Sequence, residues 1–171
     1  MNLDDVEVWI VDSSALIEAK TIVSVSNQWD AFKYLEQMVV DGLIALPRQV
    51  IREVSEIAHP DLPGAWAPGV RGLLQHPLDT GFDYLRRVTS VVPDVVDVNK
   101  PTEDADPWVL ALALLLEDEG HTVCVVTKDY VDRTSISVAT ACDTLGIDWC
   151  PIRLFLHHCG IPLLKGKGDE T

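Results

Sequence analysis

The chain has 171 residues, 47% of them apolar, which predicts one globular domain over residues 1–164 and a frayed tail over residues 165–171. No apolar run approaches the ~20 residues of a membrane-spanning helix, and the N-terminus is acidic where a signal peptide is basic, so we expect a cytoplasmic protein with no membrane association. Its 27 acidic and 13 basic residues give a formal net charge of −14, which argues against broad electrostatic attraction to nucleic acid unless a local patch or bound metal ions offset it.

The first apolar stretch, residues 6–11, stops abruptly at Asp12. An almost unbroken apolar run of this length fits a strand buried on both faces. An acid at its end would lie on the rim of a parallel sheet, where α/β proteins bind ligands. A short helix is expected over residues 13–19, capped by Ser13 or Ser14.

Two amphipathic helices are predicted next, separated by a short apolar run at residues 43–46. The first covers residues 28–41, and its core-facing stripe is Trp29, Phe32, Leu35, Met38 and Val39. The second covers residues 47–58 with Pro47 in its first turn, and its apolar face is Val50, Ile51, Val54, Ile57 and Ala58. Glu53 lies at the flank of that face and Glu56 on the opposite side, so of these acids only Glu53 can turn toward a shared site.

The middle of the chain is rich in proline and glycine. Residues 59–81 predict a long loop with one helical turn around residues 70–75, and residues 82–88 predict a short helix. Residues 99–104 break regular structure. A buried helix follows, with Asp106 as its N-cap, Pro107 as its first residue and an apolar run over residues 109–116.

A second buried strand is predicted at residues 122–127, and it too ends in polar residues, Thr127, Lys128 and Asp129. A helix over residues 135–145, a strand over residues 147–150 and a helix over residues 152–159 complete the chain. Strands that alternate with helices predict an α/β fold of three layers, α/β/α, with a mostly parallel central sheet.

Four cysteines are widely spaced, without a C-x-x-C pair, and stand in apolar surroundings, so we expect buried free thiols. A zinc site of Cys150, His157, His158 and Cys159 is the alternative, but its spacing matches no standard zinc pattern.

Acids recur at the positions that face one rim of a parallel sheet. Asp12 and Asp129 follow strands, Asp104 and Asp106 precede a buried helix, and Glu53 lies on the flank of an amphipathic helix. Carboxylates packed together repel one another, and a hard divalent cation is their usual compensation. Ligation by oxygen alone suits Mg²⁺ or Mn²⁺ rather than Zn²⁺. Each acid taken singly can also be only a cap or a turn residue.

These segments together resemble the PIN domain. The likeness rests on V-D-S-S at the end of the first strand, P-R-Q-V-I-R-E-V after the second, E-D-A-D-P-W-V-L-A-L-A at the buried helix and V-V-T-K-D after a later strand. It covers residues 8–150. It is closest to an uncharacterised prokaryotic PIN-like branch, and it is similar in general to the toxin ribonucleases of toxin–antitoxin pairs.

The resemblance implies a metal-dependent endoribonuclease that hydrolyses RNA phosphodiester bonds with Mg²⁺ or Mn²⁺. It implies four catalytic and metal-binding acids, and these are Asp12, Glu53, Asp106 and Asp129. Ser13 and Thr127 match supporting polar positions, and Asp104 is an additional acid of open role. A protein antitoxin and a homodimer are the further partners that it implies. Basic residues near the site that could contact RNA phosphates are Lys20, Lys100, Lys128 and Arg133, with Lys128 and Arg133 as the principal candidates.

Other functions compete with this one. A non-catalytic PIN-like scaffold that acts through protein or RNA partners would keep the acids, and the long apolar loop and acidic surface favour it. A haloacid dehalogenase phosphatase needs a second Asp two residues after Asp12, where this chain has Ser14. A response-regulator receiver domain needs paired acids early in the chain and a lysine at the end of a late strand. Lys128 directly follows Thr127, so the pattern of a receiver domain is not met.

Overall fold

A parallel sheet forms the centre of the molecule in the computed structural model, which describes residues 1–99, 103–128 and 136–166. Its strands are β1 (Val8–Val11), β2 (Ile44–Ala45), β3 (Val123–Thr127) and β4 (Trp149–Pro151). All pairings are parallel, and the order is β2-β1-β3-β4. The four residues of β1 are all buried, as expected for a strand that is covered on both faces.

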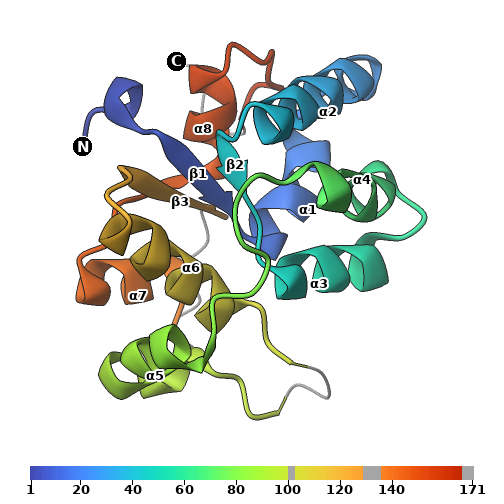
Figure 1. Ribbon diagram of the computed structural model, residues 1–171. Coiled ribbons are helices and arrows are strands. Elements are labelled where there is room, and N and C mark those ends of the chain that lie inside the picture. The colour runs from blue at the N-terminus through green and yellow to red at the C-terminus, as the bar shows by residue number, and fades with distance from the viewer. Residues whose placement is uncertain (100–102, 129–135, 167–171) are drawn as a thin grey trace.

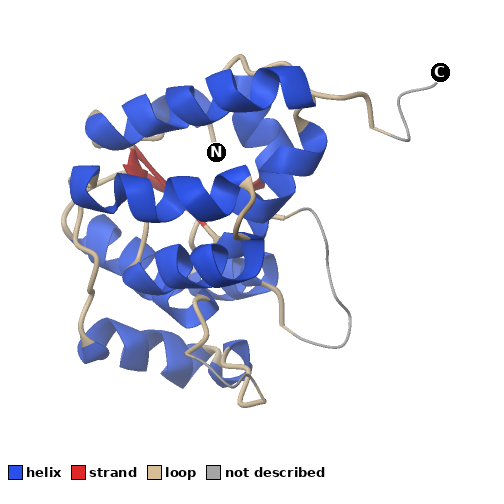
Figure 2. Cartoon of the chain, turned by 90° about the vertical axis from the view of Figure 1, so that its right-hand side faces the viewer, coloured by secondary structure: helices blue, strands red, loops and turns tan. Residues whose placement is uncertain are grey.

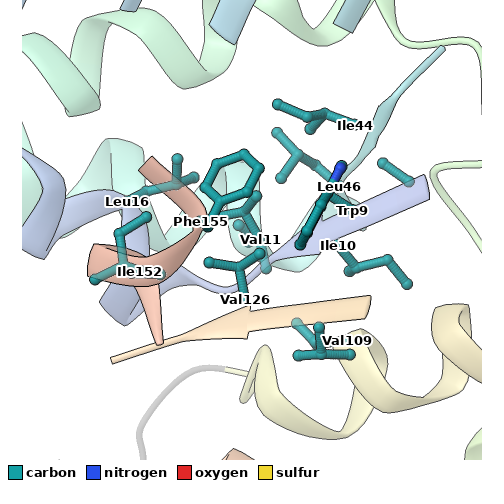
Figure 3. Packing of buried hydrophobic residues seen from close by; sticks show 14 of the residues in the cluster. Trp9, Ile10, Val11, Leu16, Ile44, Leu46, Val109, Val126, Ile152 and Phe155 are labelled. Carbon is teal, nitrogen blue, oxygen red and sulfur yellow. The ribbon is translucent and has the colours of Figure 1, made fainter. Parts of the chain in front are cut away.

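The core lies on both sides of β1 and β3. Trp9 faces α8 (Ile152–His158), where its ring centroid lies 4.9 Å from that of Phe155. Because side chains alternate along a strand, Ile10 points to the opposite face, toward Val109. Figure 3 shows Leu16 and Ile152 on the same side of the strands as Phe155, with Val109 on the other side.

Helices cover both faces of the sheet (Figures 1 and 2). On the side of α8 lie α1 (Ser13–Ile22) and α2 (Val25–Val40), while α3 (Arg48–Ala58) packs against α1 and against α4 (Leu62–Val70). On the other side α6 (Asp106–Asp118) packs against β1 and β3, α7 (Val138–Leu145) against β3 and β4, and α5 (Phe82–Val91) against α6. Short 3-10 turns occur at Leu3–Asp5, Arg71–Leu73 and Pro93–Val95. The predicted three-layer α/β/α fold is confirmed.

The prediction of a loop over residues 59–81 is wrong, because this segment contains the helix α4. Pro63 stands in the first turn, where no intrahelical N–H donor is lost, whereas Pro68 lies inside α4, near its C-terminal end, and the helix forms despite it. Gly64 is needed for close packing rather than for a turn: a Cβ at this position would lie 2.5 Å from the backbone C of Ala58 and the N of His59. The apolar side chains of α4, Trp66 among them, therefore bury themselves against α2 and α3.

Two residues of the predicted core stripes are exposed. Trp29 is 64% exposed, because it lies about 120° around α2 from Leu35, which marks the middle of the buried face. Ile57 is 65% exposed in the last turn of α3, about two turns beyond the buried Val50. Periodicity therefore predicted the buried face of both helices, but it overestimated the angular width of that face in α2 and its length in α3.

The N-caps of α1, α3 and α6 differ from the prediction by one or two residues, while α2 begins three residues before its predicted start and α7 three residues after. Asp12, and neither Ser13 nor Ser14, is the N-cap of α1. The N-cap of α3 is Pro47 itself, and that of α6 is Ala105, so that Asp106 is the first residue inside α6.

The cysteines are free, as predicted: Cys124, Cys142 and Cys150 are buried and Cys159 is half-buried. Burial and a hydrogen bond with Cys150 hold the pKa of the Cys124 thiol far above its usual range, with the hydrogen bond as the larger cause. Within the described residues, no helix is long and apolar enough to cross a membrane.

Candidate functional site

The strand order places a topological switch point between β1 and β3. From β1 the chain passes through α1 and α2 to β2 on one side, and then returns through α3 to α6 to β3 on the other side. Val11 and Val126 are paired and lie side by side in Figure 3. Asp12 and Thr127, the residues that follow them, therefore stand where the carboxyl ends of parallel strands leave a crevice in α/β folds.

Asp12 is 1% exposed, and its carboxylate accepts several hydrogen bonds. Oδ1 accepts from the backbone N of Ala15 at 2.7 Å and from Oγ of Ser14 at 2.8 Å. Oδ2 accepts from Oγ1 of Thr127, across the switch point. The bond from Ala15 is the N-cap interaction of α1, so the helix start fixes the orientation of the carboxylate.

The pKa of Asp12 is raised above its usual range, because burial penalises the charged form. Hydrogen bonds from Thr127, Ala15 and Ser14 act in the opposite direction, and the negative charge of Glu53 raises the pKa further. Glu53 thus lies within electrostatic reach of Asp12 and is half-buried, whereas Glu56 is exposed. The structure brings together Asp12, Glu53 and Thr127 of the acids and polar residues that the sequence selected.

Asp104 is buried and orders the turn that leads into α6. Its Oδ2 accepts a hydrogen bond from the backbone N of Asp97 at 3.1 Å, and its Oδ1 accepts one from the backbone N of Asp106 at 3.4 Å. This second bond performs the capping task that the sequence assigned to Asp106. Asp104 therefore has a positioning role, which the sequence left open.

Asp106 begins the helix that packs against β1 and β3, the two strands of the switch point. The segment just before it is held beside α3, since the guanidinium of Arg52 lies 3.3 Å from the backbone O of Glu103 and 3.5 Å from its Oε2. Asp106 and Glu53 thus belong to neighbouring elements, and Asp106 is half-buried.

Ser14 is the serine that touches Asp12. The sequence had selected Ser13, which is buried, but its Oγ has no hydrogen-bond partner among the described residues. The signal that could have found Ser14 is its spacing, because the side chain of a helix N-cap lies within reach of the residues two and three positions later.

The predicted phosphate contacts are placed only in part. Lys128 lies 3.5 Å from Oε2 of Glu18, and Lys20 pairs with Asp61. Asp129, Arg133 and Lys100 fall outside the described residues, and so do their predicted roles.

Carboxylate and hydroxyl oxygens are the donors around the switch point, and this chemistry fits a hard divalent cation. The raised pKa of Asp12 also fits such a cation. A bound cation would offset the cost of burying the carboxylate charge and would reduce the repulsion between Asp12 and Glu53. In the described parts of the chain, no three His, Cys, Asp or Glu side chains gather closely enough to hold an ion by themselves. The alternative zinc site of Cys150, His157, His158 and Cys159 is therefore not formed either.

Comparison with known proteins identifies the family of the chain but no individual relative. Neither the curated proteins nor the solved structures contain a significant match to this chain. A family model described as a domain of unknown function, DUF4411, matches residues 9–162, which include β1 from Trp9 onward, all of β3 and every helix from α1 to α8. The chain belongs to the DUF4411 family.

Proposed function

We propose that this protein is a metal-dependent endoribonuclease that hydrolyses RNA phosphodiester bonds. The observation that carries the proposal is the buried Asp12, which stands at a topological switch point with its pKa raised by burial and by the nearby Glu53. Among the described residues, no basic group contributes to the pKa of Asp12, and a buried carboxylate in such a crevice is a candidate for chemistry.

The acids have distinct tasks in this proposal. Asp12, Glu53, Asp106 and Asp129 would hold Mg²⁺ or Mn²⁺. When bound, such an ion supplies an activated water and neutralises charge on the phosphodiester. Thr127 and Ser14 fix the rotamer of Asp12 through their hydrogen bonds, and Asp104 fixes the start of α6. Lys128 and Arg133 are the proposed phosphate contacts beside the site.

We further propose that the protein is a nuclease of the PIN-like kind that its sequence resembles. The all-parallel sheet and the buried acid after its first strand support a PIN-like nuclease. In its proposed biological setting, the protein is the toxin of a toxin–antitoxin pair and is located in the cytoplasm. Its proposed partners are a protein antitoxin and a second copy of the chain.

The test is cleavage of labelled single-stranded RNA by the purified protein with Mg²⁺ or Mn²⁺. Asp12→Asn and Asp106→Asn should each lower the rate by at least about 10²-fold, since they remove charge but keep size. Glu53→Gln should lower it too, whereas Glu56→Gln on the exposed side of the same helix should leave it unchanged. A chelator should abolish cleavage. Cleavage that survives Asp12→Asn would reveal a contaminant and remove support for the proposal.

A second candidate function is a non-catalytic scaffold. A groove of about 220 Å³ runs between α2 and α4, and its lining includes the exposed Trp29 together with Phe32, Leu62 and Trp66. An exposed tryptophan beside an apolar groove is typical of a protein-binding surface. This function is favoured if the wild-type protein binds RNA or a partner protein but cleaves no RNA with either metal.

A further inference from the structure

Most cations among the described residues are neutralised by neighbouring carboxylates. Ion pairs join Lys20 to Asp61, Lys33 to Glu36, Arg48 to Asp79, Arg52 to Glu103, Arg86 to Asp83, Arg87 to Asp118 and Lys128 to Glu18. Arg71 lies close enough to Asp79 to contribute, after Arg48, to the lowered pKa of that carboxyl. Arg153 and Lys165 differ from these, because no carboxylate pairs with either of them within the described residues.

These two cations line the same pocket. It has a volume of about 440 Å³, and α8 and the segment after it form its walls. Arg153 and His157 stand one turn apart on α8, and Lys165 faces them from the C-terminal segment. Apolar side chains, Leu154 and Leu164 among them, form the rest of the lining, and no acid of the described chain belongs to it.

Arg153 is held in place for binding. One of its guanidinium nitrogens, Nη1, donates a hydrogen bond to the backbone O of Leu164 at 2.9 Å, which ties α8 to the C-terminal segment. A guanidinium has five N–H donors in a rigid fork, so a single bond of this kind orients the group and leaves further donors for an anion.

Strand pairing connects the pocket to the candidate site. Pro151, a residue of its lining, is the register partner of Thr127, and Thr127 donates its hydrogen bond to Asp12. Neighbouring strands lie ~4.8 Å apart, so the pocket begins roughly 10 Å, two strand spacings, from the strand that carries Asp12. A chain molecule bound across the carboxyl ends of β1, β3 and β4 can reach both places.

We propose that the Arg153–Lys165 pocket binds the phosphodiester backbone of single-stranded RNA beside the bond that is cleaved at Asp12. The inference rests on the ribonuclease function proposed above and adds the path of the substrate. The guanidinium of Arg153 and the ammonium of Lys165 contact phosphates, His157 adds a hydrogen-bonding group, and the leucine walls contact ribose and base. A local cationic pocket of this kind explains how a chain with a net charge of −14 can hold a polyanion.

The test is the salt dependence of RNA binding, measured by fluorescence anisotropy with a labelled oligouridine of about 12 nucleotides. The protein is the full chain with Asp12→Asn, which prevents turnover. Arg153→Gln and Lys165→Gln should each weaken binding and should each reduce the slope of log K against log salt by about 0.7, the value for one phosphate contact on a single strand. Arg153→Lys should restore most of the slope, because the charge returns.

Matched controls are Arg86→Gln and Lys33→Gln, which make the same change of charge at ion-paired positions on α5 and α2. They should leave the slope unchanged. Lys165→Gln keeps the hydrogen bond between Arg153 and Leu164, so its effect does not depend on the packing of the C-terminal segment.

The outcomes separate this inference from the proposed function. RNA cleavage by the wild-type protein with equal slopes for all variants would overturn the pocket assignment and leave the ribonuclease function standing. The expected loss of slope without any cleavage would support the pocket and contradict the hydrolase. Absence of RNA binding, or inorganic phosphate that binds as tightly as the oligonucleotide, would overturn the assignment of the pocket to RNA.

Discussion

Asp12 combines a structural task with the chemical task that we propose for it. It caps α1 through the backbone N of Ala15, which favours either Asp or Asn at this position. Burial is the largest effect on its negative charge and acts against it, as does the charge of Glu53, whereas the hydrogen bonds from Thr127, Ala15 and Ser14 favour it. The amide of asparagine would satisfy the cap without a buried charge, so Asp12→Asn separates the capping task from the proposed chemical one.

The raised pKa of Asp12 predicts how stability depends on pH. The folded protein holds the Asp12 proton more tightly than the unfolded chain, whose carboxyl has the ordinary value of 3.8. The protonated Asp12 carboxyl therefore contributes to the free energy of unfolding at low pH, and this contribution is lost as the pH rises from about 3.8 through the folded-state pKa. Above that window Asp12→Asn should be more stable than the wild type, by about 1.4 kcal/mol for each unit of the pKa difference.

Urea unfolding of both proteins at a series of pH values measures this difference. Taking the wild type and Asp12→Asn at the same pH cancels the contribution of the other acids. A difference that does not change with pH would contradict the buried, destabilised charge, and added Mg²⁺ should raise the stability of the wild type more than that of Asp12→Asn.

At the scale of elements, the contact between α3 and α4 depends on a missing side chain. Gly64 in the first turn of α4 lies against the backbone at the end of α3, where a Cβ has no room. Gly69 near the other end of α4 has nothing within 4 Å of an added Cβ. Two glycines of one helix therefore serve different purposes.

These glycines make a matched pair of substitutions. Gly64→Ala should lower the free energy of unfolding by about 1–3 kcal/mol, because the added methyl meets backbone atoms that cannot rotate away. Gly69→Ala should raise it by up to about 1 kcal/mol, since alanine favours a helix interior over glycine. Thermal and urea unfolding measure both. Equal effects of the two substitutions would show that α4 does not pack on α3 as described.

The strands β1 and β3 could be predicted because each is a short, continuous apolar run with a polar residue at its end, as at Asp12 and Thr127. The strand order could not, since it depends on which strands pair in space. The helix α4 could not, since proline and glycine are local signals of a turn, and only the packing against α3 shows why Gly64 is required. The same limit applies to the site. Sequence order placed Asp12 and Glu53 near one rim, but the hydrogen bond from Ser14 and the turn-ordering role of Asp104 depend on rotamers that no pattern encodes.

For the molecule as a whole, the net charge of −14 destabilises the compact state through repulsion between like charges. Ion pairs at exposed positions, such as Arg48–Asp79 and Arg86–Asp83, contribute too little to offset this repulsion. Salt should therefore stabilise the fold. Between ~10 mM and ~150 mM NaCl, where the screening length falls from about 30 Å to about 8 Å, we expect a gain of about 1 kcal/mol, or ~2–4 °C in Tm.

Calorimetry at fixed pH checks this expectation, and KCl serves as a control for ion-specific effects. A Tm that falls with salt would mean that the ion pairs outweigh the self-repulsion. The affinity for RNA should fall as the salt concentration rises, whereas the Tm should increase. The two measurements together therefore separate the repulsion within the whole surface from the attraction of RNA to the Arg153–Lys165 pocket.

The hydrogen bond between Thr127 and Asp12 joins residues that are 115 positions apart. During synthesis, a nascent chain that has not yet released β3 from the ribosome contains Asp12, Ser14 and Glu53 but has no partner for Oδ2 of Asp12 and no crevice between β1 and β3. The site is thus completed only after Thr127 has been made. For a chain proposed to cut RNA, this order of assembly delays the activity until well after the synthesis of Asp12, Ser14 and Glu53.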